Sequence, residues 1–337
     1  MERIANLEKR FYPLKAAESE VKGLVAELQP DLVVAYETAV AAALQDLPSP
    51  LITCLVDLDH LPQQLRLNAF SQRLGKASVR HRLQVAGRSW LLKQVMLRVL
   101  RRSDLVINFA AHHAAWLRDR GIDCRYLQTP IPDYASLAKE TTENLHGHRI
   151  LLLGHLRGTA TLTGLQFLTE EVLPLIAPRL AASCEVRVAG AHEDSIPPKL
   201  RYSLEAFGIR LLGFVQNIQE EIDNATLILV PTPIDLGTRV RILVGFSHGR
   251  CVIAHAANTR GIPELHNRIN CLIGRSGPEI AALIMEALSD SRLRWALGAS
   301  ARRTYLEQFA PTVVGRKFCA LAQPLMSKAE TLNRVGE

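Results

Sequence analysis

The segment Gly237-Thr238-Arg239-Val240-Arg241 is the strongest chemical signal in the sequence. It comes directly before, and runs into, an expected amphipathic helix. A glycine at such a place lets the backbone approach a phosphate, and the helix amino terminus supplies free N–H groups and the positive end of the helix dipole. Two arginines two residues apart add charge-assisted hydrogen bonds. The segment therefore predicts an anion site, the alternative being an ordinary exposed basic first turn.

A second group of polar side chains, Asp57-Leu58-Asp59-His60, follows the apolar run 51–56. Paired carboxylates in a D-x-D pattern can hold a metal ion bound to a phosphate ligand. An Asp at this place can also cap the following helix. Ligands of parallel sheets bind at the carboxyl ends of the strands, so the group is also placed to contact a substrate.

These side chains must be positioned by a folded element, and the hydrophobic pattern of the sequence predicts a sheet. Short apolar runs alternate with longer amphipathic segments, which is typical of parallel strands covered by helices. Strands are expected at 31–35, 51–56, 104–109 and 124–127, and again at 149–153, 185–188, 209–212, 226–230 and 251–254. Helices are expected at 21–28, within 78–102, and at 165–176, 199–207, 238–247, 279–289, 291–309 and 311–326. The pattern predicts an α/β protein with two doubly wound domains.

The alternation stops once, at Pro130-Ile131-Pro132-Asp133 and the polar stretch that follows. Proline-rich and polar runs of this kind are typical of interdomain connections. We therefore expect a first domain over 1–137, a linker over 138–148, a second domain over 149–310 and a terminal helical region over 311–337.

The composition is that of a globular protein, with 48% hydrophobic and 22% charged residues among 337. Six cysteines lie far apart without a C-x-x-C pair, which indicates reduced thiols and not a disulfide frame or a zinc site. The start, MERIANLEKRF, lacks the apolar core of a signal peptide, and no run has the length of a membrane span. We expect a cytoplasmic protein, soluble or peripheral at the inner face of the cell membrane.

The net charge of +7 is concentrated in one stretch, because the residues from Leu61 to Ser103 contain no Asp or Glu. The stretch holds ten cations: Arg66, Arg73, Lys76, Arg80, Arg82, Arg88, Lys93, Arg98, Arg101 and Arg102. With Trp90 and aliphatic residues interleaved, it suits an amphipathic helix at an anionic membrane surface. The alternative is a solvated helix face packed on its own domain. Nucleic acid is not expected, since no recognition module is present. The pair His112-His113 is expected on the surface at a helix start.

The second half of the sequence resembles the donor domain of glycosyltransferase family 4, the retaining enzymes of the GT-B fold. Seven segments match in the family's order: ILLLGHL (150–156), LTEEVLPLI (168–176), VRVAG (186–190), LLGFVQNI (211–218), LGTRVRIL (236–243), RGIPEL (260–265) and the ending 289–309. The first half resembles the acceptor domain at 29–36, 50–61 and 100–117. The strands that open that domain in the family have no match.

This resemblance implies two Rossmann-like domains facing across a cleft, the first incomplete, with the helix 311–326 crossing back toward the first domain. It implies transfer of a sugar, with retention, from a nucleotide-diphosphate donor to a cell-surface glycan or a lipid-linked acceptor. The partners would be the nucleotide sugar and that acceptor. No cofactor or metal is expected, since the D-x-D lies in the acceptor-side half.

The resemblance also assigns roles to residues. Arg239 and Arg241 would stabilise the departing diphosphate, while Asp57, Asp59 and His60 would contact sugar or acceptor. The donor would further be held by residues of the strand-end turns and the following helix: Gly154, His155, Gly213, Phe214, Val215, Asn217, Gly237, Thr238 and Val244.

The sequence departs from the family at the expected ribose site. Leu236 and Val244 stand where the E-x7-E pattern places two glutamates, and each lost hydrogen bond could cost about 1–3 kcal/mol. Thr163 stands where many relatives carry lysine, and His155 where many carry arginine. A rival interpretation is therefore a catalytically degenerate homologue that binds a nucleotide sugar or acts as a scaffold. A third is another GT-B enzyme, such as a sugar-nucleotide epimerase.

Overall fold

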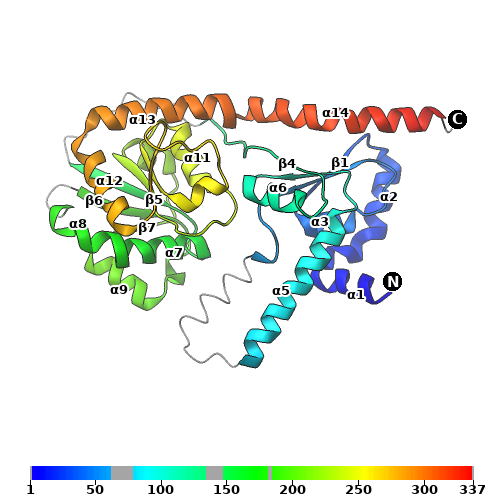
Figure 1. The fold of residues 1–337 in the computed structure, drawn as a ribbon, viewed down its shortest axis with the longest axis horizontal. Coiled ribbons are helices and arrows are strands. Elements are labelled where there is room, and N and C mark those ends of the chain that lie inside the picture. Colours follow the sequence, from blue (N-terminus) through cyan, green and yellow to red (C-terminus); the bar gives the residue numbers. More distant parts are fainter. Residues whose placement is uncertain (1, 62–78, 134–146, 181–183, 336–337) are drawn as a thin grey trace. The chain divides into compact units, whose positions relative to one another are not determined.

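The computed structural model describes residues 2–61, 79–133, 147–180 and 184–335, which fold into two compact units (Figure 1). Unit 1 comprises Met1–Gln128 together with Gly315–Glu337, and unit 2 comprises Thr129–Val314. Most of the expected linker 138–148 lies outside the described residues, which resume at Gly147.

Unit 1 contains a parallel sheet of four strands in the order β1-β2-β3-β4. All four lie within a few residues of their expected positions: β1 (Val33–Tyr36), β2 (Leu51–Leu55), β3 (Leu105–Asn108) and β4 (Cys124–Tyr126). The helical elements of this unit before Gln128 are α1 (Glu2–Phe11), η1 (Pro13–Ala17), α2 (Glu18–Leu28), α3 (Thr38–Ala43), α5 (Val79–Leu100) and α6 (Ala111–Arg118). The strand order follows the sequence, so this sheet has no reversal point within the described residues.

The core of unit 1 has two parts that share α5. One side of this helix packs with α6 and the strands, through residues such as Met96, Leu100 and Leu117. The other packs with α1 and α3 through Val95 and Val99. The buried carboxylate of Glu8 on α1 accepts a 3.0 Å hydrogen bond from Arg98 Nε and also pairs with Arg102. These contacts fix the carboxyl-terminal half of α5.

Unit 2 contains a parallel sheet of six strands in the order β10-β9-β8-β5-β6-β7. Its strands are β5 (His148–Leu153), β6 (Cys184–Ala189), β7 (Arg210–Gly213), β8 (Leu227–Val230), β9 (Val252–His255) and β10 (Leu272–Gly274). The chain moves outward from β5 to β7 and then returns to β8 on the other side of β5. The strand order therefore reverses between β5 and β8, and doubly wound sheets bind their ligands at that point, beyond the carboxyl ends of the strands.

Helices cover both faces of this sheet, as Figure 1 shows. They are α7 (Thr159–Phe167), which continues through the π-helical turn η3 (Leu168–Val172) into α8 (Leu173–Leu180), then η4 (Glu193–Ser195), α9 (Pro198–Ala206), α10 (Ile218–Asp223), α11 (Val240–Ser247), η5 (Ala256–Arg260), α12 (Gly277–Ser289), α13 (Ser291–Thr304) and the π-helical turn η6 (Tyr305–Phe309). The last helix, α14 (Pro311–Val335), begins in unit 2 and continues into unit 1. Strand β10 was not expected from the sequence.

Alternate side chains of each central strand enter different cores. Ile150 and Leu152 of β5 pack under α7, α8 and α12, while Leu151 and Leu153 pack under α11 and η6. Both faces of the strand are therefore apolar, as expected for a parallel sheet with helices on each side.

The boundary between the units lies earlier than the expected domain end at 137. The segment after Gln128 is fixed within unit 2, where Tyr305 Oη donates to Ile131 O at 2.8 Å. Arg302 donates two hydrogen bonds, of 2.8 and 2.7 Å, to the carboxylate of Asp133. Because Arg302 and Tyr305 belong to unit 2, these contacts fix the segment Thr129–Asp133 within that unit.

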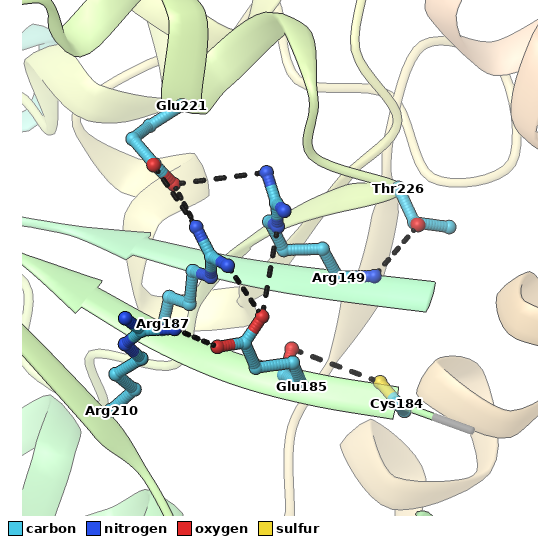
Figure 2. Close-up of polar contacts among 7 residues, drawn as sticks. All are labelled: Arg149, Cys184, Glu185, Arg187, Arg210, Glu221 and Thr226. Atoms are coloured by element: carbon cyan, nitrogen blue, oxygen red, sulfur yellow. Dashed lines mark hydrogen bonds and ion pairs between the residues drawn. The ribbon is translucent and has the colours of Figure 1, made fainter. Parts of the chain in front are cut away.

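A network of charged side chains lies at the amino-terminal ends of β5, β6 and β7 (Figure 2). Arg187 donates to both oxygens of Glu221 at 3.0 Å and pairs with Glu185 at 2.7 Å. Hydrogen bonds from Arg187 and Arg210 hold the pKa of Glu185 below its usual range. The network lies at the end of the sheet opposite the expected ligand site, so we assign it a role in fixing the strands.

Candidate functional site

The switch point between β5 and β8 is built around Gly154, the residue after β5. A Cβ atom on Gly154 would lie 2.6 Å from Thr161 Oγ1 and 2.8 Å from Arg241 Nη1. A side chain at this position would force Thr161 or Arg241 to move, so the backbone of the turn lies directly against the threonine of α7 and the arginine of α11.

The turn after β6 packs backbone to backbone on the same site. A Cβ atom on Gly190 would lie 1.7 Å from Gly154 O, and the Gly190 N–H donates to Gly213 O at 2.8 Å. Gly213 and Gly237 have φ angles of +63° and +57°, a region that favours glycine. The sequence identified Gly154, Gly213 and Gly237 as site residues but treated Gly190 only as the end of a strand.

Arg241 lies within this site and not in bulk solvent. Its Nη1 donates to Leu153 O at 2.7 Å, and its side chain lines a small cavity with Thr161 and Thr232. Burial, and after it the charge of Arg239, lower the pKa of Arg241 to about 10. A buried cation beside a second cation is stabilised by an anion that binds to both.

Arg239 is the N-cap residue directly before α11, and it is only 8% exposed. Its guanidinium group donates to Leu236 O and, at 3.2 Å, to Ile234 O in the loop after β8. Both arginines thus lie at the amino end of α11, beside the carboxyl ends of β5 and β8, and their contact with a diphosphate stays a prediction. Thr238 and Gly237 lie directly before them.

Buried polar residues hold the loops around this site. Thr232 Oγ1 donates to Ala160 O at 3.2 Å, which links β8 to the first turn of α7. Asn258 Nδ2 donates to His255 O at 2.7 Å. His255 Nδ1 accepts from Ala257 N, so Nε2 carries the proton and donates to Arg275 O at 3.0 Å. None of these positioning residues was found from sequence, because their contacts join separate strand ends.

The remaining predicted donor contacts lie at the ends of β5 and β7. His155 is exposed and its ring lies 4.8 Å from that of His192. Phe214 is 78% exposed, while Val215 packs partly on the core. Asn217 precedes α10 and its Nδ2 donates to Glu220 Oε2 at 3.3 Å. Contact of these residues with a base stays a prediction.

Val244 and Leu236 offer no hydrogen-bond acceptor in their side chains. Val244 lies on α11, half-buried, and packs against the core under that helix. Leu236 lies half-buried in the loop before it. The structure therefore supplies no carboxylate at these two positions.

In unit 1, polar side chains gather after β1 and β2. Asp59 accepts a hydrogen bond from the buried hydroxyl of Tyr12, and burial raises the pKa of Asp59. Glu37 follows β1 with a φ of +73°, a strained value for a residue other than glycine. Burial, followed by the charge of Asp59, raises the pKa of Glu37 to about 7. Sequence reasoning found Asp57 and Asp59 but missed Tyr12 and Glu37.

Two histidines of unit 1 are buried. His60 is 3% exposed and stacks 5.4 Å from Trp116; burial, then the charges of Lys93 and Arg120, lower its pKa to about 4. This placement suits packing, and contact of His60 with a substrate stays a prediction. His113 is 2% exposed with Nδ1 3.8 Å from Asp57 Oδ1, so the expectation of a surface position is wrong for His113. Packing of α6 on the sheet turns this side chain inward.

Within the described ranges, no three His, Cys, Asp or Glu side chains lie close enough together to hold a metal ion. In the same part of the chain, no helix combines the length and apolar character needed to cross a bilayer.

Comparisons with known proteins agree with this architecture. Residues 147–290 match the family of Glycosyl transferases group 1. A glycosyltransferase from Rickettsia africae superposes with a TM-score of 0.69 at 12% identity, over 93% of this chain and 81% of that one. The fold is GT-B. Sucrose-phosphate synthase from Thermosynechococcus elongatus superposes with a TM-score of 0.70 at 14% identity, over 95% of this chain and 80% of that one.

Anabaena HepE in complex with UDP shares the GT-B fold, with a TM-score of 0.69 at 14% identity over 91% and 82% of the chains. A search of curated protein sequences finds no significant match. The family match lies within unit 2 and includes the two arginines, and it indicates glycosyl transfer.

Proposed function

We propose that this GT-B protein is a retaining glycosyltransferase of family 4 that transfers a hexose from a nucleotide-diphosphate sugar to a cell-surface glycan or a lipid-linked acceptor. The observation that carries the proposal is the pair Arg239 and Arg241, buried at the amino end of α11 beside a turn at Gly154 that leaves no room for a side chain. This arrangement supports the proposal that a diphosphate binds there.

The chemistry follows from where charge develops. As the bond to the sugar breaks, negative charge grows on the leaving diphosphate, and preorganised cations at that place lower the barrier. Arg239 and Arg241 now donate to the carbonyls of Leu236 and Leu153. Their remaining N–H groups and the amino end of α11 would bind the phosphate oxygens. No metal ion or cofactor is needed for this step.

The acceptor side of the reaction is proposed for unit 1. Asp57, Asp59 and Glu37 follow the carboxyl ends of β1 and β2, where ligands of parallel sheets bind. Carboxylates accept hydrogen bonds from sugar hydroxyls, so this group would orient the transferred sugar or the acceptor.

Relatives by fold support the substrate class. HepE has been solved with UDP-glucose, and TarM with UDP and α-GlcNAc-glycerol, at 14% and 10% identity. We accordingly propose a nucleotide sugar as donor and a glycan as acceptor. We also propose a cytoplasmic location.

A thermal-shift screen tests donor binding. UDP-, GDP- and ADP-sugars are added at a large excess over a millimolar dissociation constant. Saturation to about 100 times the dissociation constant stabilises a folded protein by about 2.7 kcal/mol. We expect one nucleotide to raise the Tm and Arg239→Ala to abolish the rise, while the exposed Arg292→Ala retains it. Absence of any shift with the native protein would contradict the proposal.

A second candidate function is favoured by Val244 and Leu236. A protein without acceptors at these positions could bind a nucleotide sugar without transferring it, as a scaffold or regulator. Release of nucleotide diphosphate, measured with the donor found in the screen and a mixture of glycan acceptors, separates the two. Binding without release favours the scaffold.

A further inference from the structure

The helix α5 has two halves with different surroundings. Its carboxyl-terminal half carries the buried residues Leu92, Val95, Met96 and Val99, which enter the cores of unit 1. Residues Leu83 to Arg88 are exposed or half-exposed. In Figure 1 this first half reaches beyond the other helices and the strands of unit 1.

The cations of the basic stretch divide in the same way. In the carboxyl-terminal part, Arg98 and Arg102 pair with Glu8, and Lys93 lies over the ring of Trp116 at 5.1 Å. Arg101 donates to Arg120 O at 3.5 Å. These cations are engaged within their own unit. In the amino-terminal half, Arg88 is exposed and has no ion-pair partner among the described residues.

The exposed half also presents large apolar side chains. Leu83 is 68% exposed and Trp90 is 59% exposed. They are seven residues apart, so they lie on one face of the helix two turns from each other, with Gly87 between them. In the sequence, Arg80 and Arg82 directly precede these two turns, while Arg66, Arg73 and Lys76 lie outside the described residues.

We infer that the first half of α5, centred on Leu83, Arg88 and Trp90, is a docking surface for an anionic lipid bilayer. Charge complementarity selects this occupant: Arg88 is exposed without an ion-pair partner among the described residues, and the sequence has no Asp or Glu between Leu61 and Ser103 to offset its charge. The indole of a tryptophan is favoured at the headgroup level of a bilayer, and arginines beside it bind lipid phosphates. The inference is independent of sugar transfer.

Sedimentation of the full chain with vesicles tests the inference. We expect binding to vesicles of phosphatidylcholine mixed with phosphatidylglycerol, and little binding to phosphatidylcholine alone. Arg88→Ala should weaken binding by about fivefold, the effect of one cation near an anionic surface. Trp90→Ser should weaken it several-fold as well, and added salt should weaken what remains.

Matched controls come from α13 of unit 2, where Arg292 and Trp295 are also exposed, the latter at 77%. Arg292→Ala and Trp295→Ser should bind vesicles as the native protein does. In a Trp295→Phe background, which retains Trp90 and Trp116, vesicle binding should move the tryptophan emission to shorter wavelength, and Trp90→Ser should remove this shift. All variants change exposed side chains, and unchanged thermal unfolding in solution would show that they fold.

Three results would overturn the inference. The first is the absence of binding to anionic vesicles. The second is equal binding by the native protein and the Arg88→Ala, Trp90→Ser double variant. The third is preference for duplex or single-stranded nucleic acid over anionic vesicles at the same salt. Loss of the nucleotide thermal shift in Arg239→Ala is a separate readout, so failure of the donor site and failure of the lipid surface are distinguishable.

Discussion

Arg241 places a charge where the folded protein alone does not favour one. Its pKa falls from 12.5 to about 10 on folding, because of burial and the nearby Arg239. A basic group whose pKa is lowered by folding makes the folded state less stable at every pH at which the group stays charged, which here means below about pH 10. This destabilisation disappears only when the pH exceeds the pKa of the group in the unfolded state. An anion bound beside Arg241 would offset the destabilisation.

Arg241→Met should therefore raise the Tm of the protein without ligand. The methionine keeps much of the packing volume, removes the buried charge and loses one hydrogen bond to Leu153 O. Each kcal/mol gained corresponds to about 2–4 °C in a domain of this size. The same variant should lose the thermal shift caused by the nucleotide sugar, whereas Arg241→Lys should keep part of it. A lower Tm for Arg241→Met would show that the hydrogen bond outweighs the buried charge.

Glu37 gives the protein a predictable dependence on pH. Its pKa is raised to about 7 from 4.5, so the folded state holds a proton that the unfolded state has released between these values. The stabilisation that protonated Glu37 contributes to the folded state is complete below pH 4.5 and is lost as the pH rises through 7. Since the side chain is half-buried, we expect an effect on the order of 1 kcal/mol.

Glu37→Gln should flatten that dependence, because the amide resembles the protonated carboxyl. Unfolding of the two proteins in urea at pH 5, 6, 7 and 8 measures the difference, with the variant becoming the more stable one as the pH rises. Parallel pH profiles would mean that Glu37 titrates near its ordinary value. The strained φ of +73° at this residue is a further sign of function, since such strain persists where the site requires it.

At the scale of elements, periodicity predicted nine of the ten described strands within a few residues, since each is a largely apolar run between helices. It did not predict β10 or the helices α1, α3 and α10. The residues of the candidate sites also differ in whether the sequence alone could reveal them. Arg239 and Arg241 could be found because both lie in one local segment. Tyr12 and Asp59 are joined by a hydrogen bond across 47 residues, and only the fold brings them together.

The glycine turns of unit 2 offer a test at this scale. Gly190→Ala would place a Cβ atom 1.7 Å from Gly154 O, so the ends of β5 and β6 must separate. We expect a loss of more than about 2 kcal/mol of stability, together with loss of nucleotide binding. The matched control is Gly23→Ala in α2, where nothing lies within 4 Å of the new atom.

This control should be stabilised by about 0.5–1 kcal/mol, because alanine is the better helix former. Chemical denaturation of both variants measures the contrast. A Gly190→Ala protein as stable as the native one would show that the two turns are not held in contact in solution.

At the scale of the molecule, each unit has hydrophobic cores of its own. The two cores of unit 2 consist of residues between Ile131 and Phe309, and those of unit 1 lie within Leu7 to Tyr126. The chain 129–314 expressed alone should therefore fold cooperatively, and it should keep the nucleotide thermal shift if the diphosphate site is complete within unit 2. An unfolded product would show that unit 2 depends on unit 1.

The path of α14 has a consequence for synthesis. Residues 315–337 belong to unit 1, where Lys317 Nζ donates to Gln128 Oε1 at 3.0 Å, yet the ribosome makes them after all of unit 2. The nascent chain can thus complete unit 2, which it starts second, before unit 1, which it starts first. Until the final helix emerges, the surface it covers stays open to solvent and to chaperones, which reverses the usual order of domain folding during translation.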